Sequence, residues 1–256
     1  MKTPKYKKIG IFYLVLVFCA GSLTAQNMGP FSVSEYKETV KASGIGLISD
    51  GEMEIFLSLI DTKEAKLAKL LHSFLYNGLS SKQYAEEKIG SEKSDYCRDL
   101  AEYDDIPPWA INWGYDEQHT VALKGSYAVI SRNIYMYYGG AHPNTGVFNF
   151  VVNLKKPELL SFGSIASAAN LPKLRALVVQ ELKAELASID VFHEDDFYAN
   201  ELKINDYFPA EDGLCFHWNP YEVAYYAAGH IFVTVPWKDA EKLLNSKGKA
   251  LAKAYR

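Results

Sequence analysis

Apolar residues recur at helical spacing in one long stretch of the C-terminal half. Between residues 171 and 188 the pattern leaves one apolar stripe and an otherwise polar surface. Asn170 is a suitable N-terminal cap, and Pro172 fits the first turn because that position needs no backbone N–H donor. The stripe consists of Leu174, Leu177, Val178, Leu182 and Leu186. We therefore predict one amphipathic helix over 171–188.

The centre of the chain has the composition of β-strands. Residues 120–123, 127–138 and 146–154 are rich in Val, Ile, Tyr and Phe, which suit a pleated, partly buried surface. The last two segments flank the stretch 139–145, which contains two glycines, so they are predicted to form a hairpin with a long connection.

Shorter elements are predicted before this sheet. Residues 31–59 alternate unevenly and are interrupted by glycines, which indicates short strands joined by tight turns. A helix is expected over 62–75, followed by two shorter helices over about 80–88 and about 91–100. The two prolines within 104–108 predict a loop there, because neither can continue a helix.

The C-terminal region adds a second group of strands after the long helix. Strands are expected over 201–208, 214–218 and 231–236, followed by a helix over 237–245. The basic tail 247–256 is expected to be frayed. Antiparallel sheets with segregated helices predict the α+β fold class.

The first 25 residues have the order of a secretory signal: a basic start, an apolar run over 9–20 and small residues before Ala25. The run is shorter than the ~20 residues that span a bilayer comfortably, although a retained N-terminal anchor is the alternative. Bulky Phe18 before Cys19 argues against lipidation. We expect cleavage after Ala25, a secreted or periplasmic protein, and no transmembrane segment in the mature chain.

Cleavage would make the protein clearly acidic. The chain has 27 basic and 31 acidic residues, and the basic ones in the signal are Lys2, Lys5, Lys7 and Lys8. The mature chain would keep 27 − 4 = 23 basic residues and all 31 acidic ones, so its formal net charge would be −8. A net-negative surface without a basic cluster repels phosphate backbones and attracts cationic partners. Nucleic acid is therefore not an expected partner.

Two cysteines, Cys97 and Cys215, remain after the signal. An exported protein can form a disulfide between them, since its compartment is oxidising. Two free thiols are the alternative, because free cysteine is among the most buried residue types. Sequence spacing alone does not decide between the two.

Two motifs about seventy residues apart suggest a relationship to a known family. The first runs from Tyr137 to Asn144 and includes Gly-Gly-Ala-His at 139–142. The second runs from Asp212 to Gly229 and includes an Asp-Gly-Leu turn, Asn-Pro-Tyr-Glu at 219–222 and an alanine-rich segment. In this combination the chain resembles an exported two-part family of unknown function. Its members include the ectodomain of lysozyme-sensing anti-sigma factors and the accessory region of peptidoglycan deacetylases.

The resemblance implies a domain organisation but no reaction. It implies a signal peptide at 1–25, an N-terminal α/β partner domain at 26–161 and a C-terminal domain of unknown function at 162–256. The family's C-terminal domain is similar to a subdomain of the Hsp70 ATPase fold, but fold similarity does not carry ATPase activity, and no P-loop occurs here. The sequence shows no anti-sigma or deacetylase segment, so neither activity is expected of it.

Histidines are the main candidates for chemistry. His142 lies in a glycine-flanked loop where an imidazole could act as a general base, but a hydrogen bond that holds the loop is the favoured interpretation. No Gly-x-Ser-x-Gly nucleophile motif occurs. The cluster 193–196 (His-Glu-Asp-Asp) lacks the second half of a metal-ligand set and is interpreted as a solvated acidic turn. His217 and His230 flank the Asn-Pro-Tyr stretch and could meet in space.

Aromatic residues around the second motif are the most binding-like feature, because aromatic faces stack on sugars and anchor protein interfaces. Core packing is the competing interpretation. The predicted ligand-binding residues are Tyr138, His142, Asn144, Trp218, Asn219, Tyr221 and Tyr225. We expect a non-enzymatic binding or accessory protein of the bacterial envelope that binds cell-wall glycan or lysozyme, without cofactor or metal. An envelope-glycan enzyme with a site near His142, or a purely structural envelope protein, are the alternatives.

Overall fold

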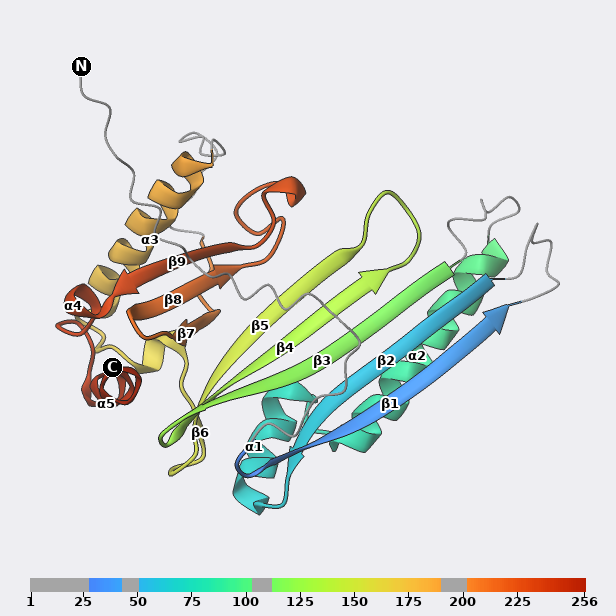
Figure 1. Cartoon of the computed structure of the whole chain (residues 1–256), viewed down its shortest axis with the longest axis horizontal. Helices are drawn as coiled ribbons and strands as arrows, with labels where there is room; N and C mark the ends of the chain where they lie inside the picture. Colours follow the sequence, from blue (N-terminus) through green and yellow to red (C-terminus); the bar gives the residue numbers. More distant parts are fainter. Residues whose placement is uncertain (1–27, 43–50, 103–111, 190–201) are drawn as a thin grey trace.

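The computed structural model describes residues 28–42, 51–102, 112–189 and 202–256, and it contains a large sheet beside a smaller one (Figure 1). The large sheet has the strand order β1-β2-β3-β4-β5-β6, and the small sheet has the order β7-β8-β9. Helices pack on the sheets in groups and do not alternate regularly with the strands. The predicted α+β class is therefore confirmed.

The large sheet is antiparallel except between β2 and β3, which run parallel. A parallel pair needs a long crossover connection, and two helices provide it. The strands of this sheet are β1 (Phe31–Ala42), β2 (Gly51–Thr62), β3 (Asn112–Lys124), β4 (Tyr127–Tyr137), β5 (Asn144–Asn153) and β6 (Glu158–Leu159). The crossover helices are α1 (Ala65–Leu75) and α2 (Ser81–Glu102).

The crossover helices α1 and α2 cover one face of the sheet, and in Figure 1 they lie behind β1, β2 and β3. Alternate residues of β2 point to this face, and all of them are fully buried: Met53, Ile55, Leu57 and Leu59. They join one apolar cluster with Leu67, Leu71, Leu75, Tyr84 and Tyr96 from the helices. Each such aliphatic side chain contributes roughly 1.5–3 kcal/mol when fully buried.

A second apolar cluster lies in the C-terminal region. It is formed mainly by α3 (Leu171–Ser188), β7 (Tyr207–Pro209), β8 (Gly213–Trp218), β9 (Ile231–Pro236), α4 (Trp237–Ala240) and α5 (Ser246–Tyr255). Four of the five residues in the predicted α3 stripe are buried there, and Leu177 is partly buried. Short 3₁₀ turns occur at η1 (Phe162–Ser164) and η3 (Tyr226–Ala228). Among the described helices, none has the length and apolar character needed to cross a bilayer.

Two regions are more regular than predicted. The short strands expected over 31–59 are the two twelve-residue strands β1 and β2. The two helices expected over 80–88 and 91–100 are one continuous helix, α2. Its buried positions follow helical spacing throughout, and they are Ser81, Tyr84, Ala85, Glu92, Tyr96 and Leu100. Several of these side chains carry polar groups, which hides the stripe from a hydrophobicity pattern.

The remaining differences concern the ends of elements. β3 begins at Asn112, well before the expected strand 120–123, whereas the strand expected over 201–208 is reduced to β7. The helix expected over 237–245 ends with α4 at Ala240. The tail that was expected to fray forms α5, because the Asn245 side chain caps it and Leu251 packs into the core.

Several expectations lie outside the described residues: the signal peptide, the loop at 104–108 and the cluster at 193–196. Cys97 is exposed, Cys215 is buried, and both are free. The alternative of two free thiols is therefore confirmed, but the expected burial is found only at Cys215.

The packing of α5 can be tested with two substitutions in that helix. We expect Leu251→Ala to lower the free energy of unfolding by about 2–5 kcal/mol, because it removes a fully buried side chain. Lys253→Ala, on the exposed side of the same helix, should change it by less than about 0.5 kcal/mol. Urea unfolding monitored by circular dichroism measures both. Equal effects of the two changes would show that α5 does not pack on the core.

Candidate functional site

The outer edge of β5 is where the two groups of elements meet. β6 pairs only with Val152 and Asn153, so none of the described strands pairs with the earlier part of β5 on that side. The Asn219 side chain takes the place of a strand at Val147: its Oδ1 accepts the Val147 N–H at 2.7 Å, and its Nδ2 donates to the Val147 carbonyl at 3.1 Å. Asp206 Oδ1 accepts the N–H of Asn149 at 3.0 Å. Side chains of the C-terminal region thus satisfy backbone groups of the large sheet.

Asp206 also begins a chain of side-chain contacts that returns to β5. Its Oδ2 lies 2.7 Å from Nδ1 of His217, and Nε2 of His217 lies 2.9 Å from Nδ1 of His230. Nε2 of His230 lies 3.0 Å from Oγ1 of Thr145. We call these four residues the polar relay. Its two histidines come from β8 and from the residue before β9, and the sequence analysis had suggested that they could meet.

One proton arrangement satisfies every contact of the polar relay. With both imidazoles neutral and protonated on Nδ1, Thr145 donates to His230, His230 donates to His217, and His217 donates to Asp206. The polar relay can hold one additional proton and keep every contact if His230 changes tautomer. A second would make the two rings point N–H groups at one another. The relay therefore opposes double protonation.

The electrostatics of His230 agree with this arrangement. Partial burial, together with the neighbouring His217, lowers the pKa of His230 to about 4, although Asp206 opposes the shift. At neutral pH the ring is uncharged and can accept the Thr145 hydroxyl proton. The arrangement orients a hydroxyl toward a base, which is one element of a nucleophilic site.

Next to the polar relay, the loop between β4 and β5 packs on the segment after β8. Gly139 and Gly140 adopt φ values of 77° and 105°, which favour glycine. The His142 ring stacks on Tyr226 with ring centroids 3.7 Å apart and planes 15° apart. The Tyr226 hydroxyl donates to the Pro143 carbonyl at 2.7 Å. The loop therefore holds its shape against the C-terminal region.

Tyr221 occupies an uncommon backbone conformation beside this stack. Its φ is 71°, which bulky residues rarely adopt, yet its side chain is 62% exposed. The turn around it is pinned because the Glu222 carboxylate accepts the Asn219 N–H at 2.7 Å and the Ala224 carbonyl accepts the Tyr221 N–H at 3.1 Å. The Tyr221 hydroxyl reaches His142 Nε2 at 3.4 Å. We call the exposed surface of His142, Tyr221 and Tyr225 the aromatic rim; Tyr225 is 59% exposed.

The structure separates the predicted binding residues into three groups. His142, Tyr221 and Tyr225 form the aromatic rim, and Asn144 is exposed at the start of β5. Tyr138 is 40% exposed, but its hydroxyl donates to Glu92 on α2.

The other two predicted residues have structural contacts. Trp218 is only 3% exposed and its indole N–H donates to the Lys203 carbonyl, so its ring belongs to the core and is not presented to solvent. Asn219 is occupied in pairing with β5. Trp218 therefore follows the core interpretation, and Asn219 instead joins the C-terminal region to β5.

A second polar cluster, around Glu117 on β3, was missed by the sequence analysis. The Glu117 carboxylate is fully buried and accepts hydrogen bonds from Tyr84 at 2.8 Å, Tyr115 at 2.7 Å and Arg132 at 2.8 and 3.0 Å. His119 Nε2 lies 3.2 Å from it without good hydrogen-bond geometry. Burial raises the pKa of Glu117, but His119 and Arg132 outweigh that effect and lower it to about 2. The sequence pattern that could have predicted this cluster is the alternation of Tyr115, Glu117 and His119, which places all three on one face of the strand.

No group of three or more histidine, cysteine, aspartate or glutamate side chains converges as a metal site within the described residues. The polar relay contains three such residues, but they follow one another in a line and do not surround a common point.

Comparisons with known proteins place the fold among proteins of unknown function. Residues 164–238 match a family model described as "Protein of unknown function (DUF3298)". A crystal structure of a DUF3298 family member from Bacteroides fragilis is similar over 89% of this chain and 99% of its own, with a TM-score of 0.67 and 19% identity. A DUF3298 family protein from Pseudomonas aeruginosa is similar over 86% and 97%, with a TM-score of 0.56 and 12% identity. No curated protein matches the chain.

The glycine-dependent shape of the β4–β5 loop gives one prediction. Gly140→Val should lower the free energy of unfolding by about 1–3 kcal/mol, because a β-branched residue is strained at positive φ. No atom lies within 4 Å of the added Cβ, so strain alone is tested. Gly163→Val, which also meets no neighbour but lacks positive φ, is the control. Thermal and urea unfolding measure both, and an unchanged Gly140→Val protein would contradict the expectation.

The polar relay gives a prediction on pH. The pKa of His230 falls from an unfolded value of about 6.5 to about 4 on folding. Its stabilising contribution is therefore complete above about 6.5 and is lost as the pH falls through about 4, with a slope of at most about 1.4 kcal/mol per pH unit. Glu117, with its lowered pKa, contributes to the slope only below about 4.5.

Urea unfolding between pH 4 and 6.5 tests this assignment. We expect His230→Gln to flatten the rise in stability with pH. If the free energy of unfolding of His230→Gln rises with pH as steeply as that of the wild type, His230 is not the source of the rise.

Proposed function

We propose that this protein is an exported, non-enzymatic binding or accessory protein of the bacterial cell envelope, and that it binds through the aromatic rim. The observation that carries the proposal is Tyr221, a bulky residue held at positive φ with 62% of its side chain exposed. Such a conformation costs about 1–3 kcal/mol and persists where the surrounding structure enforces it, often at functional sites. Two features hold Tyr221 in this conformation: the hydrogen-bonded turn around it, and the His142 ring, which contacts its hydroxyl and stacks on Tyr226.

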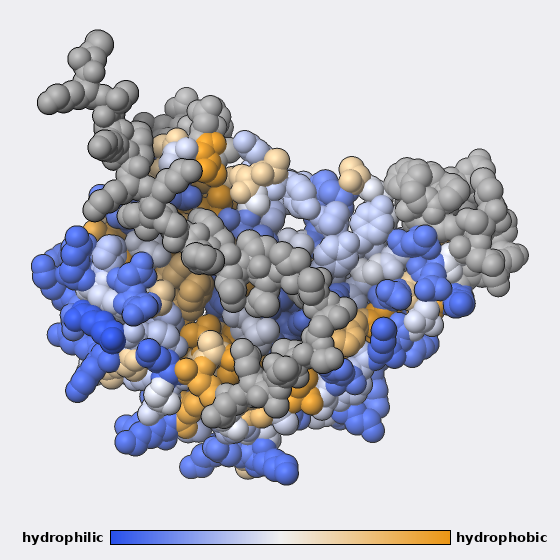
Figure 2. Space-filling model, in the orientation of Figure 1, coloured by the Kyte–Doolittle hydropathy of each residue, from blue (hydrophilic) through white to orange (hydrophobic). Residues whose placement is uncertain are grey.

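The composition of the aromatic rim suits a binding surface better than a folding core. Tyr221 and Tyr225 are exposed, and Tyr226 lies against both the Tyr221 and the His142 rings. Tyrosine offers a large rigid contact area at a low conformational cost, together with a hydroxyl that can hydrogen-bond. On the face that Figure 2 shows, the orange areas outside the grey atoms alternate with blue and pale ones.

Two ligand classes are supported by separate arguments. Exposed tyrosine rings can stack on the sugar rings of a cell-wall glycan. The net charge of −8 expected after signal cleavage attracts a cationic protein such as lysozyme. The sequence resemblance to lysozyme-sensing ectodomains and to deacetylase accessory regions supports the same two ligands.

The experiment is calorimetric titration of the processed protein with lysozyme and with a peptidoglycan fragment, at low and at high salt. We expect binding to at least one, and lysozyme binding should weaken with salt because screening shortens electrostatic attraction. Tyr225→Ala should weaken binding by about 2 kcal/mol or more if this residue is an anchor. Ile189→Ala, which truncates an apolar residue of 40% exposure at the end of α3, is the matched control.

Tyr221→Gly distinguishes the role of the tyrosine ring from that of the strained backbone, because it removes the ring and relieves the strain. Glycine accepts positive φ, so this variant should be at least as stable as the wild type and yet bind more weakly. If neither ligand binds at low salt, the proposal fails for both. If Tyr221→Gly binds as tightly as the wild type, the aromatic rim is not the binding surface.

An enzyme acting on envelope glycans is the second candidate, and the polar relay favours it. His230 lies where a general base for the Thr145 hydroxyl would lie. His217 and then Asp206 follow behind it, as groups that orient such a base would. Mass spectrometry of glycan incubated with the protein tests it. Turnover that is lost in Thr145→Val or His142→Ala would replace the binding proposal with an enzymatic one.

A further inference from the structure

The large sheet has two outer edges, and the described chain closes only one of them. At the β5 edge, Asn219 and Asp206 bond to the strand. β1 forms the other edge: it pairs with β2 on one side, and no strand in the described ranges pairs with it on the other. Its outward-facing backbone N–H and C=O groups therefore lack a strand partner, an arrangement that invites pairing with another chain.

β1 lacks most of the features that usually protect an exposed edge. It runs over twelve residues, Phe31–Ala42, and each has its own partner in β2, so no bulge interrupts the strand. It contains no proline. Short strands, bulges and prolines commonly block an edge, and charged side chains are another means. Of these features β1 has only charges, at Glu35, Lys37, Glu38 and Lys41.

The chain that precedes β1 does not cover this edge. Gly29 lies against Leu123 of β3, so the described chain approaches β1 from the interior of the sheet. Cleavage after Ala25, which the sequence predicts, would leave only residues 26 and 27 before the described chain begins. A residue spans at most about 3.6 Å, so two residues cannot cover a strand of this length.

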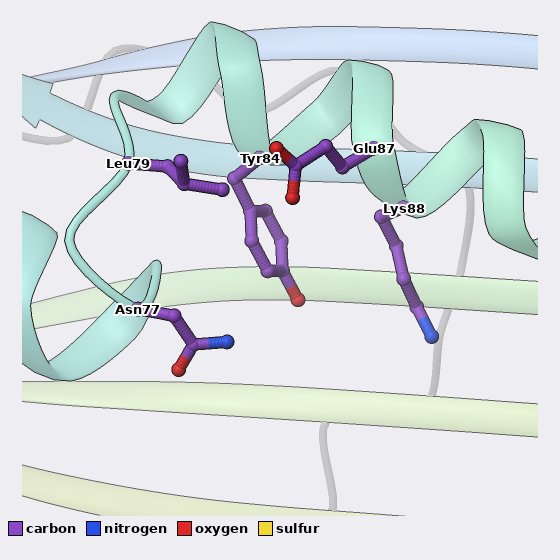
Figure 3. Close-up of a pocket in the computed structure, with 5 residues that line it drawn as sticks. All are labelled: Asn77, Leu79, Tyr84, Glu87 and Lys88. Atoms are coloured by element: carbon purple, nitrogen blue, oxygen red, sulfur yellow. The ribbon is translucent and has the colours of Figure 1, made fainter.

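Helix α2 also leaves the edge open, because it contacts β1 and β2 through one face of the sheet. Its Tyr84 and Lys88 side chains extend away from β1 and line a cavity of about 330 Å³ beside the α1–α2 turn (Figure 3). The Tyr84 hydroxyl donates to Glu117 on β3, and Lys88 Nζ lies 4.1 Å from the centre of the Tyr115 ring on the same strand. These contacts lie over the interior of the sheet.

The charges of β1 favour one antiparallel register with a second copy of the same strand. If the helices of both copies lie on the same side of a continued sheet, odd-numbered residues face odd-numbered ones, because successive side chains alternate between faces. When Tyr36 faces its own counterpart, Glu35 faces Lys37 of the second copy, and Lys37 faces Glu35 of the second copy. Charges of unlike sign therefore meet twice, which stabilises an antiparallel pair.

Like charges oppose the neighbouring registers. A register centred on Glu35, Lys37 or Glu38 places that residue directly against its own counterpart. The register centred on Tyr36 contains no like-charge pair over residues 31–41. It also brings the two Tyr36 rings together, and an aromatic cross-strand pair adds stability. Tyr36 is only partly buried in a single copy, so its ring has surface left to cover.

We propose that β1 is a self-association edge, which pairs antiparallel with β1 of a second copy of this chain in the register centred on Tyr36. The two large sheets then form one continuous sheet with twofold symmetry, and each strand makes the same contacts to the other. β1 lies at the opposite edge of the sheet from β5 and the aromatic rim, so association leaves the rim accessible. The proposal does not depend on the function proposed for the rim.

Sedimentation velocity of the processed protein should show a reversible monomer–dimer equilibrium at micromolar concentrations. Lys37→Glu makes both unlike pairs into like pairs and should weaken dimerisation about tenfold. Glu35→Lys combined with Lys37→Glu makes them unlike again and should return the affinity to within about threefold of the wild type. Lys66→Glu, the same charge change at an exposed position of α1, should have no effect. Because Glu35 and Lys37 are exposed, all variants should melt as the wild type does.

Cysteine crosslinking tests the register itself. Residues directly opposite in an antiparallel pair have Cα atoms about 4.5–5.5 Å apart, a distance that a disulfide spans. In a Cys97→Ser background, which removes the native exposed thiol, Tyr36→Cys should crosslink two copies on mild oxidation. Ser34→Cys should not, because it faces Glu38 of the second copy.

Three results would each overturn the proposal. They are a monomer at every concentration up to millimolar, a double variant that dimerises no better than Lys37→Glu, and equal crosslinking at positions 36 and 34. Loss of ligand binding in Tyr225→Ala would change none of these measurements, so the two proposals fail independently.

Discussion

The unpaired edge of β5 is the constraint on which the arrangement of this protein depends. A strand edge presents N–H and C=O groups that need partners, and an open edge invites pairing with another chain. Here the C-terminal region closes the edge with side chains, as Asn219 pairs with Val147 and Asp206 accepts from Asn149. Two polar side chains thereby determine how the small sheet sits against the large one.

The same closure positions the candidate functional surfaces. Asp206 turns its second carboxylate oxygen to His217, so the residue that closes the edge also starts the polar relay. Asn219 begins the turn that holds Tyr221 at positive φ and presents its ring to solvent. The aromatic rim and the polar relay therefore share one structural support. A partner that disturbs the edge of β5 would affect both.

The large sheet, in contrast, contains a buried ion pair between Glu117 and Arg132. Burying the Glu117–Arg132 pair has a desolvation cost of several kcal/mol per ion, and good geometry with additional hydrogen bonds must offset it. Tyr84 and Tyr115 provide those bonds, because both hydroxyls donate to Glu117. A buried ion pair is weak evidence for stability by itself, since apolar residues can often replace it.

The sequence by itself determined the features that depend on local spacing. The α3 stripe, the β4–β5 hairpin and the α+β class follow from periods of 3.6 and 2 residues, and the positive φ of Gly140 agrees with the loop expected there. Sequence alone also suggested that His217 and His230 could meet. Only the tertiary structure decided that Trp218 is buried while Tyr221 is exposed, and that Thr145 completes the polar relay. The contact that completes the relay joins residues 85 positions apart, which no local pattern records. The continuity of α2 was hidden for a related reason: its buried face includes Glu92 and tyrosines whose polar tips find partners only after folding.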